Sequence, residues 1–190
     1  MRISGGEWRG RNLRVPQGDA VRPTQDRVRE ALFSMIQFEI AGASFLDLFA
    51  GSGAVGLEAL SRGAARATFV ESSPRHAECI AGNAAMLKAE ARVSVVRADA
   101  YAWTASAGPM AFDIAYADPP YELGAQQGYA PILEALAERG VVKAGGLFIA
   151  EMKAHRDPDV SDRWELCRDR IYGHARLAIS RLAGPAGAAE

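Results

Sequence analysis

The sequence of 190 residues has little of what would mark a disulfide-rich, metal-binding or membrane protein. Its two cysteines, Cys79 and Cys167, lie far apart and lack the spacing of metal ligands, so we expect neither a disulfide framework nor a zinc site. No apolar run approaches the length of a membrane helix, and the first residues do not resemble a secretory leader. These absences favour a cytoplasmic protein with reduced thiols and no metal.

Net charge is also small, at −1, which by itself argues against a nucleic-acid partner. The charge is unevenly distributed, however, because residues 1–29 hold seven arginines against three acidic residues, a balance of +4, and the remainder carries −5. We expect residues 2–15 to form a basic hairpin that could grip phosphates and stack Trp8 on a base. The alternative is a solvated hairpin at the edge of a sheet.

The tetrapeptide Asp118-Pro119-Pro120-Tyr121 follows the apolar run 112–117, which is typical of a buried strand. Ligands of open α/β sheets bind at the carboxyl ends of such strands. Because prolines lack N–H donors, an amino group on a planar base could donate to the Asp118 carboxylate and the Pro119 carbonyl while Tyr121 stacks on the ring. An ordinary Asp-Pro turn is the alternative, and the tetrapeptide alone does not decide between them.

A second motif, residues 45–57, runs from an apolar strand through a glycine turn into a helical pattern. Gly51 and Gly53 allow positive φ and a close approach of the backbone to a ligand, and the following helix offers N–H groups at its N-terminus. With Gly56 the spacing also fits the dinucleotide fingerprint, and Glu71 ends the next apolar run. A nicotinamide cofactor and a tight turn without a ligand both stay open at this point.

Acidic residues at successive strand ends favour S-adenosylmethionine over a nicotinamide cofactor. Asp47 lies before the glycine turn, where a carboxylate could meet the methionine ammonium but would repel a pyrophosphate. Asp99 and Ala100 follow the third predicted strand, a position suited to the adenine amino group. Glu71 and Asp118 complete a set of one acid at each of four strand ends. A typical dehydrogenase would also need a histidine or lysine proton relay, and the three histidines lie on a predicted helix or far downstream.

Strands and helices alternate to about residue 152, which predicts a mostly parallel, doubly wound α/β sheet. An amphipathic helix is predicted over 24–40, ahead of the first sheet strand. Residues 164–172 and 175–181 flank a Gly-His turn and predict a closing antiparallel hairpin.

The hydrophobic content, 49%, is sufficient for one compact core. We therefore expect a single domain over 1–182, made of a basic N-terminal hairpin extension at 1–23 and a catalytic core at 24–182. Residues 183–190 are small and aperiodic, which predicts a disordered tail. The loop 122–128 is a candidate to become ordered over a target base.

With these residues in view, the chain resembles the class I methyltransferases, and among them the RsmD family, which methylates the N2 amine of a guanine in small-subunit (16S) ribosomal RNA. Residues 1–13 and 22–33 resemble that family's opening, whereas the glycine loop and Asp-Pro-Pro-Tyr are shared more widely. The family often has phenylalanine where this chain has Tyr121. The resemblance implies a Rossmann-like fold, S-adenosyl-L-methionine as cofactor with S-adenosyl-L-homocysteine as product, and ribosomal RNA in an assembled or partly assembled small subunit as partner.

The same resemblance implies roles for individual residues. Cofactor binding would involve Thr24, Asp47, Gly51, Gly53, Glu71, Asp99 and Ala100. The target-base site would consist of Asp118, Pro119 and Tyr121. RNA contacts would come from Arg2, Trp8, Arg9, Arg11 and Arg22. From the sequence pattern itself, Thr24 is better explained as a helix N-cap.

The chemistry implied is direct displacement, in which the amine of a flipped base attacks the methyl group without a metal. An adenine-N6 methyltransferase acting on DNA or RNA would use the same loop and is one alternative. A nicotinamide-binding oxidoreductase and a cofactor-binding protein without catalysis are two others, and the Asp-Pro-Pro-Tyr loop argues against both.

Overall fold

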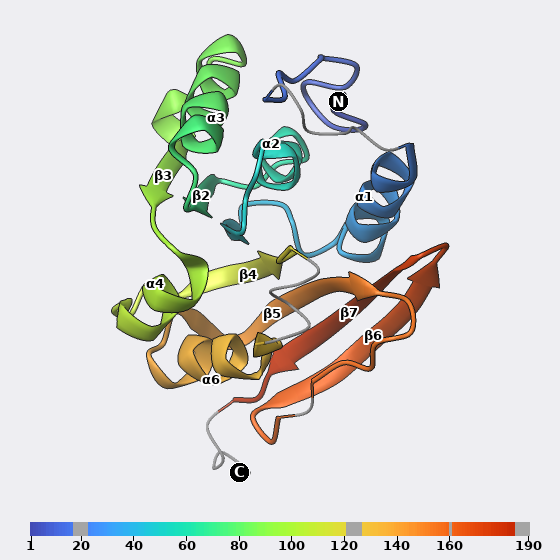
Figure 1. Ribbon diagram of the computed structural model, residues 1–190, viewed down its shortest axis with the longest axis vertical. Coiled ribbons are helices and arrows are strands. Elements are labelled where there is room, and N and C mark those ends of the chain that lie inside the picture. The colour runs from blue at the N-terminus through green and yellow to red at the C-terminus, as the bar shows by residue number, and fades with distance from the viewer. Residues whose placement is uncertain (17–22, 121–126, 160, 185–190) are drawn as a thin grey trace. The chain divides into compact units, whose positions relative to one another are not determined.

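The computed structural model describes residues 1–16, 23–120, 127–159 and 161–184. The chain divides into two compact units, Met1–Ala100 and Tyr101–Glu190. Figure 1 shows the helices and strands of each unit, coloured along the chain. Within the described ranges, no helix combines the length and the apolar character needed to cross a membrane.

The sheet of the first unit consists of β1 (Ser44–Leu48), β2 (Arg66–Glu71) and β3 (Val93–Arg97), which are parallel and run in the order β3-β2-β1. β1 is buried along its whole length, as expected for a strand covered on both faces. The register pairs Asp47 with Phe69 and Glu71 with Arg97. Parallel pairing therefore brings the carboxyl ends of these strands to one edge of the sheet.

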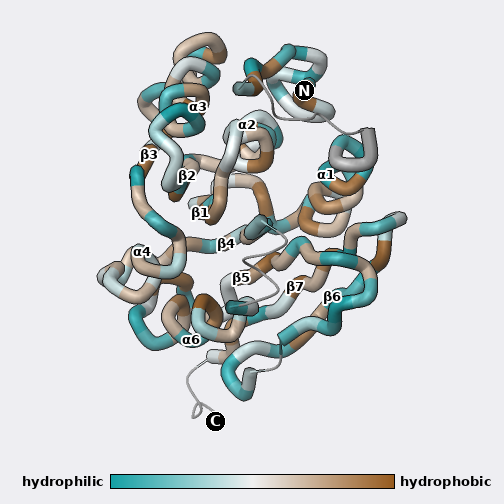
Figure 2. The backbone as a smooth tube through the Cα atoms, in the orientation of Figure 1, coloured by the Kyte–Doolittle hydropathy of each residue, from teal (hydrophilic) through white to brown (hydrophobic). Residues whose placement is uncertain are grey.

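The helical segments of the first unit are α1 (Pro23–Met35), α2 (Ala54–Ser61), α3 (Pro74–Met86) and the 3-10 turn η1 (Glu90–Arg92). α3 begins with a proline in its first turn, and the Ser73 side chain accepts a hydrogen bond from His76 N at 3.4 Å. Hydrophobic residues, brown in Figure 2, recur along α1. Phe33 of α1 packs against Phe45 of β1, with ring centroids 6.4 Å apart.

Residues 1–16, which we call the N-terminal segment, fold back on themselves and pack against α2. Ile3 N donates to Arg11 O at 3.0 Å, but regular pairing is limited to one bridge, between Arg2 and Asn12. The basic hairpin predicted here is thus an antiparallel loop without extended strands. The backbone of this loop contacts the backbone at the end of α2. Glu7 N donates to the carbonyl of Ser61, the last residue of α2, at 2.7 Å.

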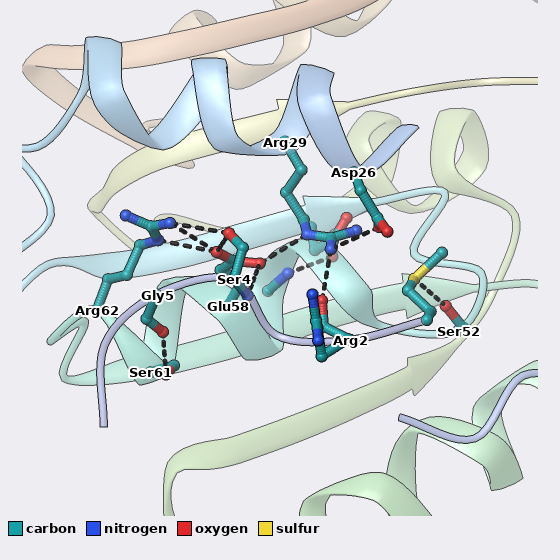
Figure 3. Close-up of polar contacts among 12 residues, drawn as sticks. Arg2, Ser4, Gly5, Asp26, Arg29, Ser52, Glu58, Ser61 and Arg62 are labelled. Carbon is teal, nitrogen blue, oxygen red and sulfur yellow. Dashed lines mark hydrogen bonds and ion pairs between the residues drawn. The ribbon is translucent and has the colours of Figure 1, made fainter. Parts of the chain in front are cut away.

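A buried ionic cluster fastens the N-terminal segment and α1 to α2 (Figure 3). Glu58 of α2 is 0% exposed and accepts from Arg29 Nε at 2.6 Å and from Arg62 Nη2 at 2.8 Å. Ser4 donates to the same carboxylate, and Arg29 also donates to Arg2 O at 2.7 Å. Burial alone would raise the pKa of Glu58, but the hydrogen bonds from Ser4, Arg29 and Arg62 outweigh it and lower that pKa below its ordinary value.

The second unit holds the strands β4 (Phe112–Ala117), β5 (Val142–Lys153), β6 (Trp164–Tyr172) and β7 (Ala175–Leu182), and the helices α4 (Ala100–Ser106) and α6 (Ala130–Glu138). β4 is parallel to β5, whereas β7 runs antiparallel to both β5 and β6. Phe148 of β5 is buried and makes edge-on ring contacts with Tyr129 and Trp164. The indole of Trp164 donates to Leu133 O of α6 at 2.9 Å.

Parallel strands alternating with helices, closed by the β6–β7 hairpin, confirm the predicted α/β class. β4 has the predicted bounds, and the turn between β6 and β7 uses Gly173 at φ 61°. The predicted end of the first helix is wrong, because α1 ends at Met35. Ile36 and Ile40 are both buried, so the apolar period continues through a turn that carries the chain toward β1.

Replacing Glu58 by alanine should destabilise the fold, since Arg29, which is 5% exposed, would lose its buried partner. We expect a loss of about 3 to 5 kcal/mol in the free energy of unfolding at pH 7, measured by urea denaturation. Glu7→Ala is the matched control, because Glu7 is 63% exposed beside Arg92, and it should change stability by less than about 0.5 kcal/mol. Equal effects of the two substitutions would contradict a structural role for the cluster.

Candidate functional site

The glycine loop, residues 49–53, joins β1 to α2 and has an unusual backbone. Phe49, Gly51 and Gly53 all have positive φ, at 60°, 54° and 77°. For phenylalanine this conformation is strained by roughly 1 to 3 kcal/mol, and such strain tends to be retained at functional sites. The turn closes through Gly53 N, which donates to Ala50 O at 2.8 Å. A Cβ built on Gly51 would meet no atom within 4 Å, so the space beside this residue can admit a ligand.

Asp47 supports this loop from the interior. Its carboxylate is 1% exposed, and its Oδ2 accepts a hydrogen bond from Gly56 N in the first turn of α2 at 2.9 Å. Burial raises the pKa of Asp47 to about 8, the hydrogen bond from Gly56 opposes the rise, and the charge of Glu71 adds to it. The structure therefore shows Asp47 bound to the helix backbone.

Gly56 is needed for the packing of α2 on the sheet. A Cβ at this position would lie 2.3 Å from Cε1 of Phe69 and 3.1 Å from Oδ2 of Asp47. The third glycine of the motif thus permits close contact between helix and strand, as that position does in dinucleotide-binding turns.

Glu71, at the end of β2, binds the backbone of two loops. Its Oε2 accepts from Gly51 N at 2.7 Å and its Oε1 accepts from Ser73 N at 2.8 Å. His76 Nδ1 lies 3.7 Å from the same carboxylate. Glu71 is buried, at 7% exposed, and its carboxylate borders the glycine loop through the bond from Gly51 N.

Asp99 and Ala100 follow β3 at the same edge of the sheet. Ala98 N donates to Glu71 O at 3.1 Å, which ties the end of β3 to the end of β2. Asp99 is exposed and directly precedes α4, whose first residue is the buried Ala100. Thr24 lies in the first turn of α1, and its side chain is outside the described residues. The first unit therefore places carboxylates at the ends of β1, β2 and β3.

Asn83 of α3 is a component of the loop that the sequence prediction missed. It is 0% exposed, and its Nδ2 donates to Ser52 O at 3.3 Å and to Arg14 O at 3.0 Å. Its Oδ1 accepts from Arg14 N at 2.8 Å. The available signal was a lone amide on a helix face that is otherwise apolar, with Ile80 and Ala84 as its neighbours.

In the second unit, β4 ends at Ala117 and delivers the proline motif. Asp118 is half-buried, Pro119 is buried and Pro120 is exposed. Tyr121 lies outside the described residues, as does most of the predicted loop 122–128. The structure therefore confirms the position of Asp118 and Pro119 at the carboxyl end of a strand.

The chain after this loop is anchored by polar side chains of the second unit. Tyr101 Oη donates to Gly128 O at 2.8 Å, and Tyr129 N donates to the carboxylate of Asp159. Tyr129 Oη donates to the carbonyl of Glu151. Burial raises the pKa of Tyr129, and the negative charge of Asp118 raises it further. The Tyr129 phenol therefore stays protonated near the Asp118 carboxylate.

The predicted RNA-binding residues divide into two groups. Arg2, Arg9 and Arg11 are exposed on the N-terminal segment. Trp8, in contrast, is 8% exposed, and the Arg92 guanidinium lies 4.9 Å from its ring centroid. The expectation that Trp8 stacks on a base is therefore not supported, because the indole is already packed. Arg22 is outside the described residues.

No group of three or more histidine, cysteine or acidic side chains that could hold a metal occurs among the described residues. The first unit offers a strained glycine loop with open space beside Gly51, bordered by carboxylates, and the second unit offers an Asp-Pro-Pro strand end. The first set suits a ligand with hydroxyl and amino groups, and the second suits an amine donor.

The chain is similar to known proteins along nearly its whole length. The family model Conserved hypothetical protein 95 matches residues 1–181. Ribosomal RNA small subunit methyltransferase D of Escherichia coli (strain K12) is 40% identical over 180 residues, which cover 94% of this chain and 88% of that protein. The Haemophilus influenzae protein of the same name is 32% identical, with 91% of this chain and 89% of that protein covered.

Solved structures show the same likeness. yhhF from Escherichia coli superposes with a TM-score of 0.85 at 36% identity, covering 97% of this chain and 98% of that chain. An RNA methyltransferase from Salinibacter ruber, solved in complex with S-adenosyl-L-homocysteine, superposes with a TM-score of 0.64 and covers 90% of this chain and all (100%) of that one. At 17% identity the second likeness concerns the fold alone.

The raised pKa of Asp47 predicts a specific pH dependence of stability. Between 3.8, its ordinary value, and about 8, the folded state binds a proton that the unfolded state releases, so stability from this group is lost as pH rises through that range. Asp47→Asn retains an acceptor for Gly56 N without ionising. Its urea-unfolding free energy should therefore fall less between pH 5 and pH 8 than that of the wild type. Glu30→Gln, at an exposed position on α1, is the control. Parallel curves for Asp47→Asn and the wild type would refute the assignment.

Proposed function

Since the chain belongs to the Conserved hypothetical protein 95 (RsmD) family, we propose that it methylates the N2 amine of a guanine in small-subunit (16S) ribosomal RNA with S-adenosyl-L-methionine. The observation that carries this proposal is the Asp118-Pro119 strand end, in a chain that is 40% identical to a ribosomal RNA small subunit methyltransferase D. The same likenesses support a Rossmann-like class I methyltransferase fold. We also propose that residues 1–182 form a single domain, since the family model matches residues 1–181.

The residues of the glycine loop fit the cofactor. Open space beside Gly51 can admit it, and Glu71 at the margin of the loop suits ribose hydroxyls while Asp99 suits the adenine amine. In this proposal Gly53 and Ala100 line the cofactor site and Thr24 contacts the methionine end of the cofactor. Asp47 acts mainly by holding Gly56. When bound, the cofactor supplies an electrophilic methyl group on a sulfonium, with S-adenosyl-L-homocysteine as the leaving product.

The target amine is oriented by acceptors of the second unit. Its two protons are directed to the Asp118 carboxylate and the Pro119 carbonyl, and Tyr121 stacks on the flipped base. An aryl amine is a weak nucleophile because its lone pair is delocalised, and these hydrogen bonds direct that pair toward the methyl group. As the N–C bond forms, Asp118 takes the proton released by nitrogen.

Ribosomal RNA is the partner in this proposal, in an assembled or partly assembled small subunit in the cytoplasm. Arg2, Arg9 and Arg11 are exposed and can contact phosphates, and Arg22 adds a fourth charge in the same part of the sequence. Trp8 contributes by fixing the fold of the N-terminal segment.

Transfer of a labelled methyl group tests the proposed activity and its substrate together. Small subunits lacking the modification, and naked small-subunit RNA, would be incubated with labelled S-adenosyl-L-methionine and digested to nucleosides. We expect label in N2-methylguanosine, with faster transfer to subunits than to naked RNA. Label in N6-methyladenosine would overturn the choice of base, and no transfer to either substrate would overturn the proposed function.

Asp118→Ala should separate catalysis from cofactor binding. We expect methyl transfer to fall by at least about 100-fold, because the acceptor that orients the amine is lost, while affinity for S-adenosyl-L-homocysteine stays within about twofold. Asp99→Ala is the matched control with the reverse pattern, weakening cofactor affinity by about tenfold through loss of one charged acceptor. Calorimetry and initial rates measure the two quantities, and an Asp118→Ala enzyme with most of its rate would remove Asp118 from the site.

A further inference from the structure

Asn83 connects two parts of the first unit to which different ligands are assigned. One is the glycine loop, through the bond from Nδ2 to Ser52 O at 3.3 Å. The other is the N-terminal segment. The Asn83 side chain donates to Arg14 O at 3.0 Å and accepts from Arg14 N at 2.8 Å. A single side chain on α3 thus fixes the backbone on both sides.

The amide has little freedom to adopt another arrangement. Asn83 is 0% exposed, and a buried amide that loses a hydrogen bond has no water to replace it. Its Nδ2 protons are shared among Ser52 O, Arg14 O and Cys79 Sγ, which lies 3.7 Å away, and its Oδ1 accepts from Arg14 N. A shift of Arg14 therefore changes the hydrogen bond available to Ser52 O, and a shift of the loop changes the bonds available to Arg14.

A second contact joins the same two segments. Ser52 Oγ lies 3.7 Å from the sulfur of Met1, within the distance of a weak hydrogen bond. Ser52 is flanked by Gly51 and Gly53, and Arg14 is exposed three residues after Arg11. The bonded positions thus lie next to the proposed cofactor loop on one side and next to the proposed phosphate contacts on the other.

We propose that Asn83 is a positioning residue that couples RNA contact by the N-terminal segment to cofactor binding by the glycine loop. The inference rests on the proposed function, because it takes the two ligands from it. RNA would fix the N-terminal segment, and the cofactor would fix the glycine loop. Because Asn83 is hydrogen-bonded to both segments, binding of one ligand favours binding of the other, and the two bind with positive cooperativity. Linkage requires the effect to be reciprocal.

Equilibrium dialysis with labelled S-adenosyl-L-homocysteine, with and without saturating small subunits that lack the modification, measures the coupling. For the wild type we expect subunits to tighten cofactor binding by about fivefold or more. For Asn83→Leu we expect this ratio to fall close to one. Arg14→Ala is the matched control, because it removes a charge but leaves the backbone atoms that Asn83 binds, and it should weaken subunit binding while keeping the ratio. If Asn83 had a structural role alone, Asn83→Leu would change the cofactor affinity with and without subunits by the same factor. The ratio of the two affinities would then stay as in the wild type.

A measurement on the unaltered protein covers the case in which Asn83→Leu does not fold. Addition of S-adenosyl-L-homocysteine should slow amide hydrogen exchange in peptides covering residues 9–16, because the bonds through Asn83 reach Arg14 N. Unchanged exchange there, or a coupling ratio of one in the wild type, would overturn the inference while leaving the proposed function intact. A protein that neither binds S-adenosyl-L-homocysteine nor transfers methyl groups would instead overturn the proposed function.

Discussion

The strained glycine loop after β1 depends on buried side chains that bind its backbone and the start of α2. Glu71 accepts from Gly51 N, Asp47 accepts from Gly56 N, and Asn83 donates to Ser52 O. These acceptors and this donor come from β2, β1 and α3, so the loop conformation is determined by the packing of the first unit. These bonds help to compensate for the strained positive φ of Phe49.

The N-terminal segment is hydrogen-bonded to the other end of α2. Ser61 O accepts a hydrogen bond from Glu7 N, and the buried carboxylate of Glu58 accepts hydrogen bonds from Arg29, Arg62 and Ser4. α2 is thus fixed at its start by Asp47 and along its length by the ionic cluster. A segment whose arginines are proposed to contact RNA is in this way also a structural part of the unit that carries the proposed cofactor site.

Sequence patterns predicted those features that depend on local chemistry. Apolar runs gave the strands, with β4 at its observed bounds, and the glycine spacing gave the loop at Gly51 and Gly53. The closing hairpin was predictable because its two segments flank the turn at Gly173 and His174. Strand ends could be identified as well, so the position of Asp118 after β4 and that of Glu71 at the end of β2 followed from the sequence.

Features set by contacts distant in sequence could not be predicted. Asn83 binds residues 31 and 69 positions away, and Glu58 binds Arg29 across 29 positions. The burial of Trp8 likewise depends on Ser61 and Arg92, which no local pattern indicates. The end of α1 was predicted wrongly for the same reason. Ile36 and Ile40 continue the helical spacing of apolar residues, but they are buried after the helix has ended.

We propose that the glycine loop, held by buried side chains, is the cofactor site. A crystal structure of the protein with S-adenosyl-L-homocysteine would test this assignment. We expect the ligand over Gly51, with its ribose at Glu71 and its adenine at Asp99, and with the bonds from Gly56 N to Asp47 and from Asn83 to Ser52 O intact. A ligand bound elsewhere, or a loop that refolds on binding and breaks those bonds, would contradict it.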